Sequence, residues 1–173
     1  METTKQTSKV YFKTLKIIHL ALTLGIVFVG LIGSFLIFSG KMSNNMTDLN
    51  EVLFYIIPVF SLGGLFVSNW TYKNKLSELK EKKDLNAKMA NYRDILIVRY
   101  ALIEVPTFFA FVAIMLTGNL LYLAYIALMI LFMIYWRPTR NSVIADLELN
   151  LNESTIVRNP DSIIAEFNIT KRD

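Results

Sequence analysis

A single carboxylate lies near the middle of an apolar stretch of this sequence, the run 95–117. Glu104 stands there among aliphatic and aromatic residues, and the other charged residue of the run, Arg99, lies five positions earlier. A charge at bilayer depth costs roughly 2.5–3.5 kcal/mol on insertion scales, so it is normally neutralised, paired or used. A carboxyl group in such a place can hold a proton or a cation, which makes Glu104 the first candidate for chemistry.

The residues around Glu104 are of types that can form hydrogen bonds with it. In a helix, Tyr100 lies four residues before it and Thr107 three residues after it, so both share its face. Pro106 has no N–H to donate to the carbonyl of Leu102, which leaves an acceptor beside the carboxyl group. We expect a neutral Glu104 that donates to that carbonyl or to Thr107 and that can release its proton.

Four apolar stretches are long enough to cross about 30 Å of hydrocarbon at 1.5 Å per residue. The last is the shortest and must run nearly upright or recruit polar residues at its ends. Together they predict an all-α polytopic membrane protein with four transmembrane helices, at 17–38, 52–70, 95–117 and 120–136.

Counting along these stretches from one edge of the bilayer puts Glu104 roughly 15 Å deep, near the midplane. Ser61 and Gly25 fall at similar depth in the second and first stretches. Gly63 and Gly64 lie a turn or less from Ser61, and small residues permit close helix approach in lipid. We therefore expect Glu104 to face a packed seam between helices rather than acyl chains. Pro58 in the second stretch frees a backbone carbonyl, as Pro106 does in the third.

Basic residues predict the orientation of the chain in the membrane. The N-terminal tail and the 71–94 loop are rich in lysine, whereas the 39–51 loop has one lysine and the 118–119 turn has no basic residue. The positive-inside rule then places both termini and the 71–94 loop in the cytoplasm, with the chain in the cell (inner) membrane. The residues that carry this bias are Lys5, Lys9, Lys13, Lys16, Lys73, Lys75, Lys80, Lys82, Lys83, Lys88 and Arg93.

Two basic residues lie near the predicted cytoplasmic edge. Arg99 is about 140° around the helix from Glu104, so it points elsewhere and can extend to the interface. Pairing of Arg99 with Glu104 of a neighbouring copy stays open. His19 is in the first turn of its stretch, where an imidazole satisfied at the interface and a proton relay or cofactor ligand are both open.

Composition excludes several classes of function. The chain has 173 residues, of which 54% are hydrophobic, and no cysteine, so disulfides and thiol catalysis are excluded. One histidine excludes a multi-histidine metal site within one chain. The net charge of +4 needs no nucleic-acid partner, since membrane insertion accounts for it. No nucleophile–base pair or phosphate-binding glycine loop is apparent, so we expect no enzyme, no cofactor and no metal.

The polar segments predict the remaining organisation. The 71–94 loop mixes charges of both signs and has no proline or glycine, so we expect it to extend its neighbouring helices as a cytoplasmic helical hairpin. Residues 1–137 then form the transmembrane domain, and residues 138–173 form a short cytoplasmic tail. Apolar residues at 143, 144, 147 and 151 predict one amphipathic helix in this tail. A turn at 159–162 is expected to cap a second helix at 163–167.

The segment 92–113, which contains Ala101, Glu104 and Pro106, resembles the carboxylate-bearing helix of the c subunit (proteolipid) of rotary ATP synthases. In that family a small residue and two aliphatics precede the acid, and small or proline residues and an aliphatic run follow it. Here Ala101 and two aliphatics precede Glu104, and Pro106 and an apolar run follow it. Gly63 and Gly64 come before it across a polar loop, as in the proteolipid hairpin, so the resemblance covers about residues 55–115. It implies that Glu104 binds a proton or sodium. An extra apolar stretch on each side distinguishes this chain from the two-helix subunit.

Two functions follow from these observations. The first is a small oligomeric membrane protein that binds or carries protons or sodium, with Glu104 as the titrating group. The second is a non-enzymatic membrane scaffold or accessory subunit in which Glu104 is a buried structural acid. In both, we expect the partners to be the lipid bilayer and either further copies of the chain or other subunits of a membrane complex.

Overall fold

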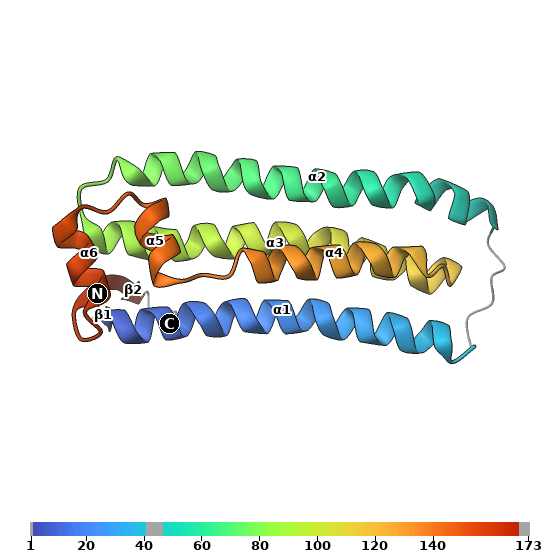
Figure 1. Ribbon diagram of the computed structural model, residues 1–173, viewed down its shortest axis with the longest axis horizontal. Coiled ribbons are helices and arrows are strands. Elements are labelled where there is room, and N and C mark those ends of the chain that lie inside the picture. The colour runs from blue at the N-terminus through green and yellow to red at the C-terminus, as the bar shows by residue number, and fades with distance from the viewer. Residues whose placement is uncertain (1, 41–46, 170–173) are drawn as a thin grey trace. The chain divides into compact units, whose positions relative to one another are not determined.

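A computed structural model describes residues 2–40 and 47–169. Helices dominate, and two short strands come from the ends of the chain (Figure 1). The elements are, in order, β1 (Glu2–Thr7), α1 (Ser8–Phe38), α2 (Thr47–Lys80), α3 (Leu85–Thr117), α4 (Leu121–Tyr135), α5 (Arg140–Asp146), α6 (Leu151–Arg158) and β2 (Ile163–Ile169).

Three helices, α1, α2 and α3, are each long and apolar enough to cross a membrane. The shorter α4 reaches that length only together with α5, and an 82° bend separates the two. The described part of the chain therefore holds three candidate spans, or four if the bent pair counts as one. Pro58 and Pro106 lie inside α2 and α3, which continue through them.

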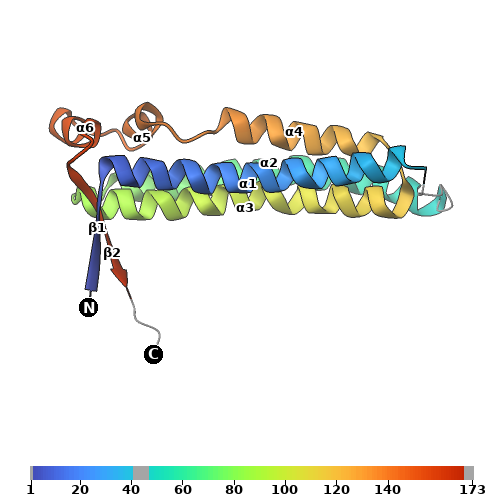
Figure 2. The ribbon, with the colours of Figure 1, turned by 90° about the horizontal axis from the view of Figure 1, so that it is seen from below.

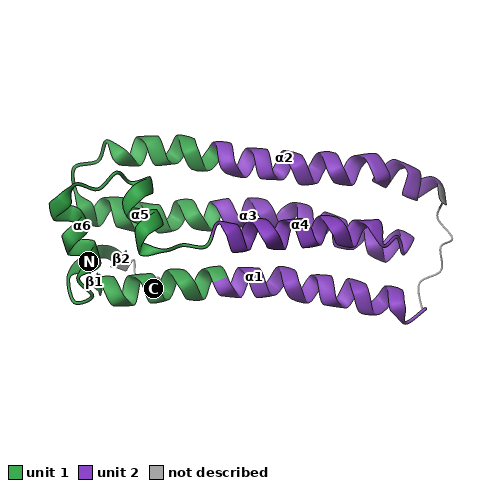
Figure 3. Ribbon diagram, viewed as in Figure 1, with its two compact units in different colours: residues 1–19, 71–98, 137–173 green, residues 20–70, 99–136 purple. Residues whose placement is uncertain are grey.

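The chain forms two compact units, and the long helices contribute to both (Figure 3). The apolar unit comprises residues 20–70 and 99–136, where segments of α1, α2, α3 and α4 run side by side (Figures 1 and 2). Large aliphatic side chains such as Ile57, Ile103 and Ile114 fill its interior. Many other large apolar side chains of this unit are exposed, which is expected of a surface that faces lipid rather than water.

The polar unit comprises residues 1–19, 71–98 and 137–173. Its core includes Tyr11, Met89 and Val143, each fully buried. The Tyr11 hydroxyl donates to the carbonyl of Met89 at 2.6 Å, and the Ser8 hydroxyl donates to the carbonyl of Val157 at 2.6 Å. These two bonds hold the start of α1 to α3 and α6.

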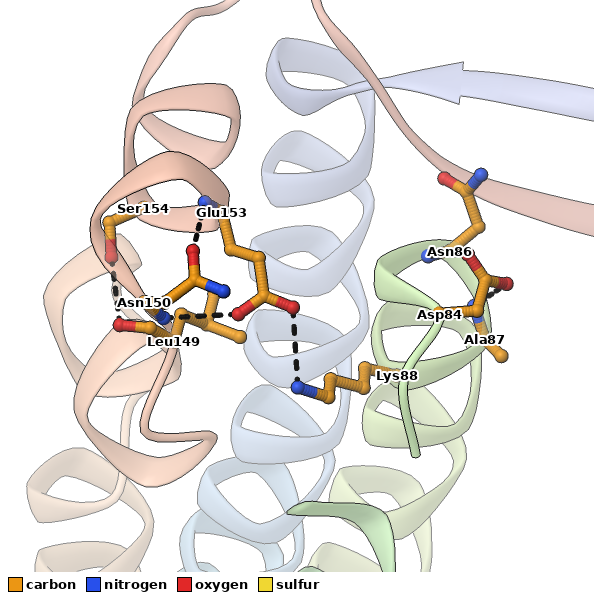
Figure 4. Close-up of polar contacts among 8 residues, drawn as sticks. All are labelled: Asp84, Asn86, Ala87, Lys88, Leu149, Asn150, Glu153 and Ser154. Atoms are coloured by element: carbon orange, nitrogen blue, oxygen red, sulfur yellow. Dashed lines mark hydrogen bonds and ion pairs between the residues drawn. The ribbon is translucent and has the colours of Figure 1, made fainter. Parts of the chain in front are cut away.

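The tail departs from the predicted pair of helices. One helical stretch was expected through 143–151, but α5 and α6 are separate, and Glu148 between them has a positive φ of 49°. That backbone conformation interrupts a helix. Asn150 then starts α6 through a capping box with Glu153 (Figure 4).

The predicted helix at 163–167 is wrong, because this segment is part of β2. It pairs antiparallel with β1, with Lys5 opposite Glu166 and Thr4 opposite Phe167, and the two strands run side by side (Figure 2). Isoleucine and phenylalanine favour strands, and Ile164 is buried. The expected turn at 159–162 is present, with the Ser162 N–H donating to the carbonyl of Asn159 at 3.3 Å.

Polar contacts fix α3 and α6 within the polar unit. Asp84 accepts hydrogen bonds from the backbone N–H groups of Asn86 and Ala87 at the start of α3 (Figure 4). Lys88 in the next turn forms an ion pair with Glu153 of α6 at 3.3 Å. Because both side chains are largely buried, this contact connects two segments that are far apart in the sequence.

Candidate functional site

Glu104 lies on α3 where that helix faces α1. With Thr107 and Phe108 it lines a cavity of about 400 Å³. The opposite wall belongs to α1 and is entirely apolar: Ala21, Leu22, Gly25, Ile26, Phe28 and Val29. Glu104 is half-buried and makes no hydrogen bond or ion pair with another residue that the structure describes. The carboxyl group is thus presented to a cavity within the apolar unit.

The second polar group of this cavity is the Thr107 hydroxyl. It is buried and donates to the carbonyl of Ile103 at 3.0 Å, which leaves its lone pairs able to accept a hydrogen bond. Across the cavity, a Cβ atom added at Gly25 would have no neighbour within 4 Å. The cavity therefore owes part of its volume to the missing side chain of Gly25.

Two other predicted site residues lie elsewhere in the apolar unit. Tyr100 is fully buried, and its hydroxyl donates to the carbonyl of Trp136 at 3.0 Å. Ser61 is also buried, and its hydroxyl finds no hydrogen-bond partner among the described residues. Neither residue lines the Glu104 cavity. The structure thus unites Glu104 with Thr107 and separates both from Tyr100 and Ser61.

The glycines of α2 lie against Pro106 of α3. A Cβ atom added at Gly64 would overlap the Pro106 ring and approach the carbonyl oxygen of Leu102 at 3.3 Å. Gly63 has open space instead. These residues line a second cavity of about 290 Å³ that contains no titratable side chain, formed by Val59, Phe60, Gly63, Gly64, Val67, Leu102, Val105 and Pro106. Pro58 is half-buried in α2 and lines neither cavity.

Arg99 lies over the ring of Trp136, with the guanidinium carbon 4.0 Å from the ring centroid. Its side chain is largely buried, and its carbonyl accepts a hydrogen bond from the Ser68 hydroxyl at 2.9 Å. An arginine stacked on an indole is stabilised by the negative face of the ring. The sequence predicted that Arg99 lies near one bilayer edge, but no sequence pattern indicated its contact with Trp136.

A further polar cluster lies in the polar unit. The hydroxyls of Tyr72 and Tyr92 donate to one oxygen of Asp146 at 2.7 and 2.8 Å. Burial, followed by the neighbouring Tyr72 and Asp146, raises the pKa of Tyr92 above its usual value of 10.0. Tyr92 therefore remains a protonated donor, and the cluster holds α5 against α2 and α3.

The described residues contain no group of three or more histidine, aspartate or glutamate side chains that could hold a metal ion. Comparison with protein-family models, with curated proteins and with solved structures found no match.

Proposed function

We propose that this chain is a non-enzymatic protein of the inner membrane that crosses the bilayer four times, with α4 as a short fourth span. Three long apolar helices and the many exposed apolar side chains of the apolar unit support membrane insertion. The distribution of lysine in the sequence supports the orientation. Both termini and the 71–94 segment would be cytoplasmic. The helical ends of α2 and α3 in the polar unit would then form a cytoplasmic hairpin.

Within this arrangement, Glu104 would bind and release a proton. The observation that carries this proposal is the placement of its carboxyl group in an apolar cavity with no cationic partner among the described residues. Such an acid is more stable when protonated, and ionisation needs a new partner or water. A proton-binding Glu104 also agrees with the resemblance to the proteolipid.

A proton fits this cavity better than sodium does. Hard cations are held by several oxygen ligands, about six to eight for calcium. The side chains that line the cavity supply only the carboxyl group of Glu104 and the hydroxyl of Thr107. Four spans give a single chain little room for a pathway across the membrane, so a homo-oligomer would build it.

Labelling with a hydrophobic carbodiimide tests this function, because the reagent modifies protonated carboxyl groups in apolar surroundings. The purified chain would be labelled across pH, with and without sodium, and the sites read by mass spectrometry. We expect modification of Glu104 that falls as the pH rises and does not respond to sodium. The Glu104→Gln variant provides the blank. Failure to modify Glu104 at any pH would refute a titrating role.

A scaffold or accessory subunit is the second candidate, and a surface of the polar unit favours it. A groove of about 170 Å³ between the end of α2 and the start of α3 carries charges of both signs, including Lys75, Glu78, Lys82 and Asp94. Such a surface suits a protein partner. In this case the Glu104→Gln chain would keep its function, whereas charge reversal at Lys75 and Lys82 would release the partner.

A further inference from the structure

The Glu104 cavity is larger than proton binding requires. Its volume of about 400 Å³ falls within the range of roughly 300–1,000 Å³ that small-molecule sites occupy. Such sites have mostly apolar walls and a few polar groups that orient the ligand. The cavity has this composition, because the Glu104 carboxyl and the Thr107 hydroxyl interrupt an otherwise apolar lining.

The cavity meets the outer surface of the apolar unit at exposed residues that include Gly25 and two phenylalanines. Phe28 of α1 is 64% exposed and Phe108 of α3 is 59% exposed, and both line the cavity. In a chain that spans the membrane, this surface contacts acyl chains. A ligand would therefore enter sideways from the hydrocarbon, which selects for lipophilic molecules. Aromatic rings at the entrance also attract cations through their negative faces.

The polar groups select the chemical class of the ligand. A carboxylate and a hydroxyl acceptor on the α3 wall of an apolar cavity complement an ammonium group on an apolar body. An anion would find no cationic group among the lining residues, and a neutral alcohol would make a weaker hydrogen bond than a charged donor. A bare metal ion would find too few oxygen ligands among the lining side chains.

We infer that the cavity between α1 and α3 binds a lipophilic primary amine, with its nitrogen at Glu104 and its apolar body against Gly25. This inference rests on the proposed function, because the proton held by Glu104 passes to the amine as the ion pair forms. A neutral acid and a neutral amine become a carboxylate and an ammonium, so the net charge in the membrane stays zero. The pair avoids a lone charge at this depth.

The test measures equilibrium binding of radiolabelled 1-adamantylamine to the full chain in nanodiscs, with empty nanodiscs as background. Unlabelled 1-adamantanol and 1-adamantanecarboxylic acid are the competitors, since they keep the apolar cage and change only the polar group. We expect one saturable site per chain. Unlabelled amine should displace the radiolabelled amine from it, and neither the alcohol nor the acid should do so at equal concentration. Absence of a saturable component, or equal competition by the alcohol, would overturn the inference.

Three variants locate the site. Glu104→Gln removes the charge and should weaken binding about tenfold or more, as loss of a charge-assisted contact does. Gly25→Leu should weaken binding by a similar factor because the added side chain occupies the space of the ligand. Gly63→Leu is the matched control, because it fills the cavity that has no acid and should leave binding unchanged. Unchanged binding in Gly25→Leu would overturn the inference even if Glu104→Gln does not fold. Carbodiimide labelling of Glu104 without amine binding would defeat this inference alone, whereas absence of labelling would defeat the proposed function.

Discussion

The adjacent glycines Gly63 and Gly64 of α2 have different surroundings. Gly64 lies against the Pro106 ring, whereas Gly63 faces open space. We expect Gly64→Ala to destabilise the chain by about 1–3 kcal/mol, because the added methyl group overpacks the contact between α2 and α3. Gly63→Ala should stabilise it by up to about 1 kcal/mol through helix propensity. Thermal unfolding of both variants in the same detergent tests this difference. Equal shifts of the unfolding temperature would show that the contact between Gly64 and Pro106 is not rigid.

Two lysine–glutamate ion pairs that connect helices to the C-terminal segment differ in burial, so they test how much burial contributes to the stability of that docking. Lys88–Glu153 connects α3 to α6 with side chains only 9% and 15% exposed, whereas Lys80–Glu148 is a more exposed pair at 33% and 71%. Removing one partner of a buried ion pair leaves the other charge buried and unpaired. We therefore expect Lys88→Met to lower the free energy of unfolding by about 3–5 kcal/mol. Lys80→Met should cost about 1 kcal/mol or less.

Hydrogen exchange at residues 151–158 measures the docking of α6 in these variants. Lys88→Met should speed exchange at these residues. Adding Glu153→Gln to Lys88→Met should restore much of the lost stability, because no unpaired charge then remains buried. Exchange that responds equally to Lys80→Met would mean that burial does not distinguish the pairs.

Local sequence patterns predicted the long helices well, and they failed where a distant segment decides the structure. The apolar runs and the absence of breakers in 71–80 were enough for α2, because a helix depends on its own residues. Residues 163–167 were wrongly predicted as helix because the partner of β2, which is β1, lies at the opposite end of the sequence. Counting depth placed both Gly25 and Ser61 level with Glu104, but only the packing of α1 against α3 decides that Gly25 lines its cavity and Ser61 does not. Helix geometry placed Tyr100 on the same face as Glu104, but its hydroxyl bonds to the carbonyl of Trp136 instead.

At the scale of the whole molecule, the orientation in the membrane can be tested directly because the chain has no cysteine. Ser39→Cys places one thiol just after α1, and Lys83→Cys places one between α2 and α3. We expect a membrane-impermeant maleimide to label Ser39→Cys on intact spheroplasts and Lys83→Cys only after lysis. The reverse pattern would invert the topology, and labelling of both in intact spheroplasts would indicate leaky cells or fewer spans.

The pairing of β1 with β2 also affects how the chain is made. β1 is synthesised well before its partner β2, and Glu2 lies opposite Ile169 in the pair. At about 5–20 residues per second, roughly 8–30 s of synthesis separate the two strands. Until β2 is synthesised, the backbone groups of β1 that bond to it lack this partner. Helices α1 to α4 are all translated during that time. The polar unit is therefore completed last, and translation that stops before β2 leaves its N-terminal strand without a partner, a state that quality-control proteases can recognise.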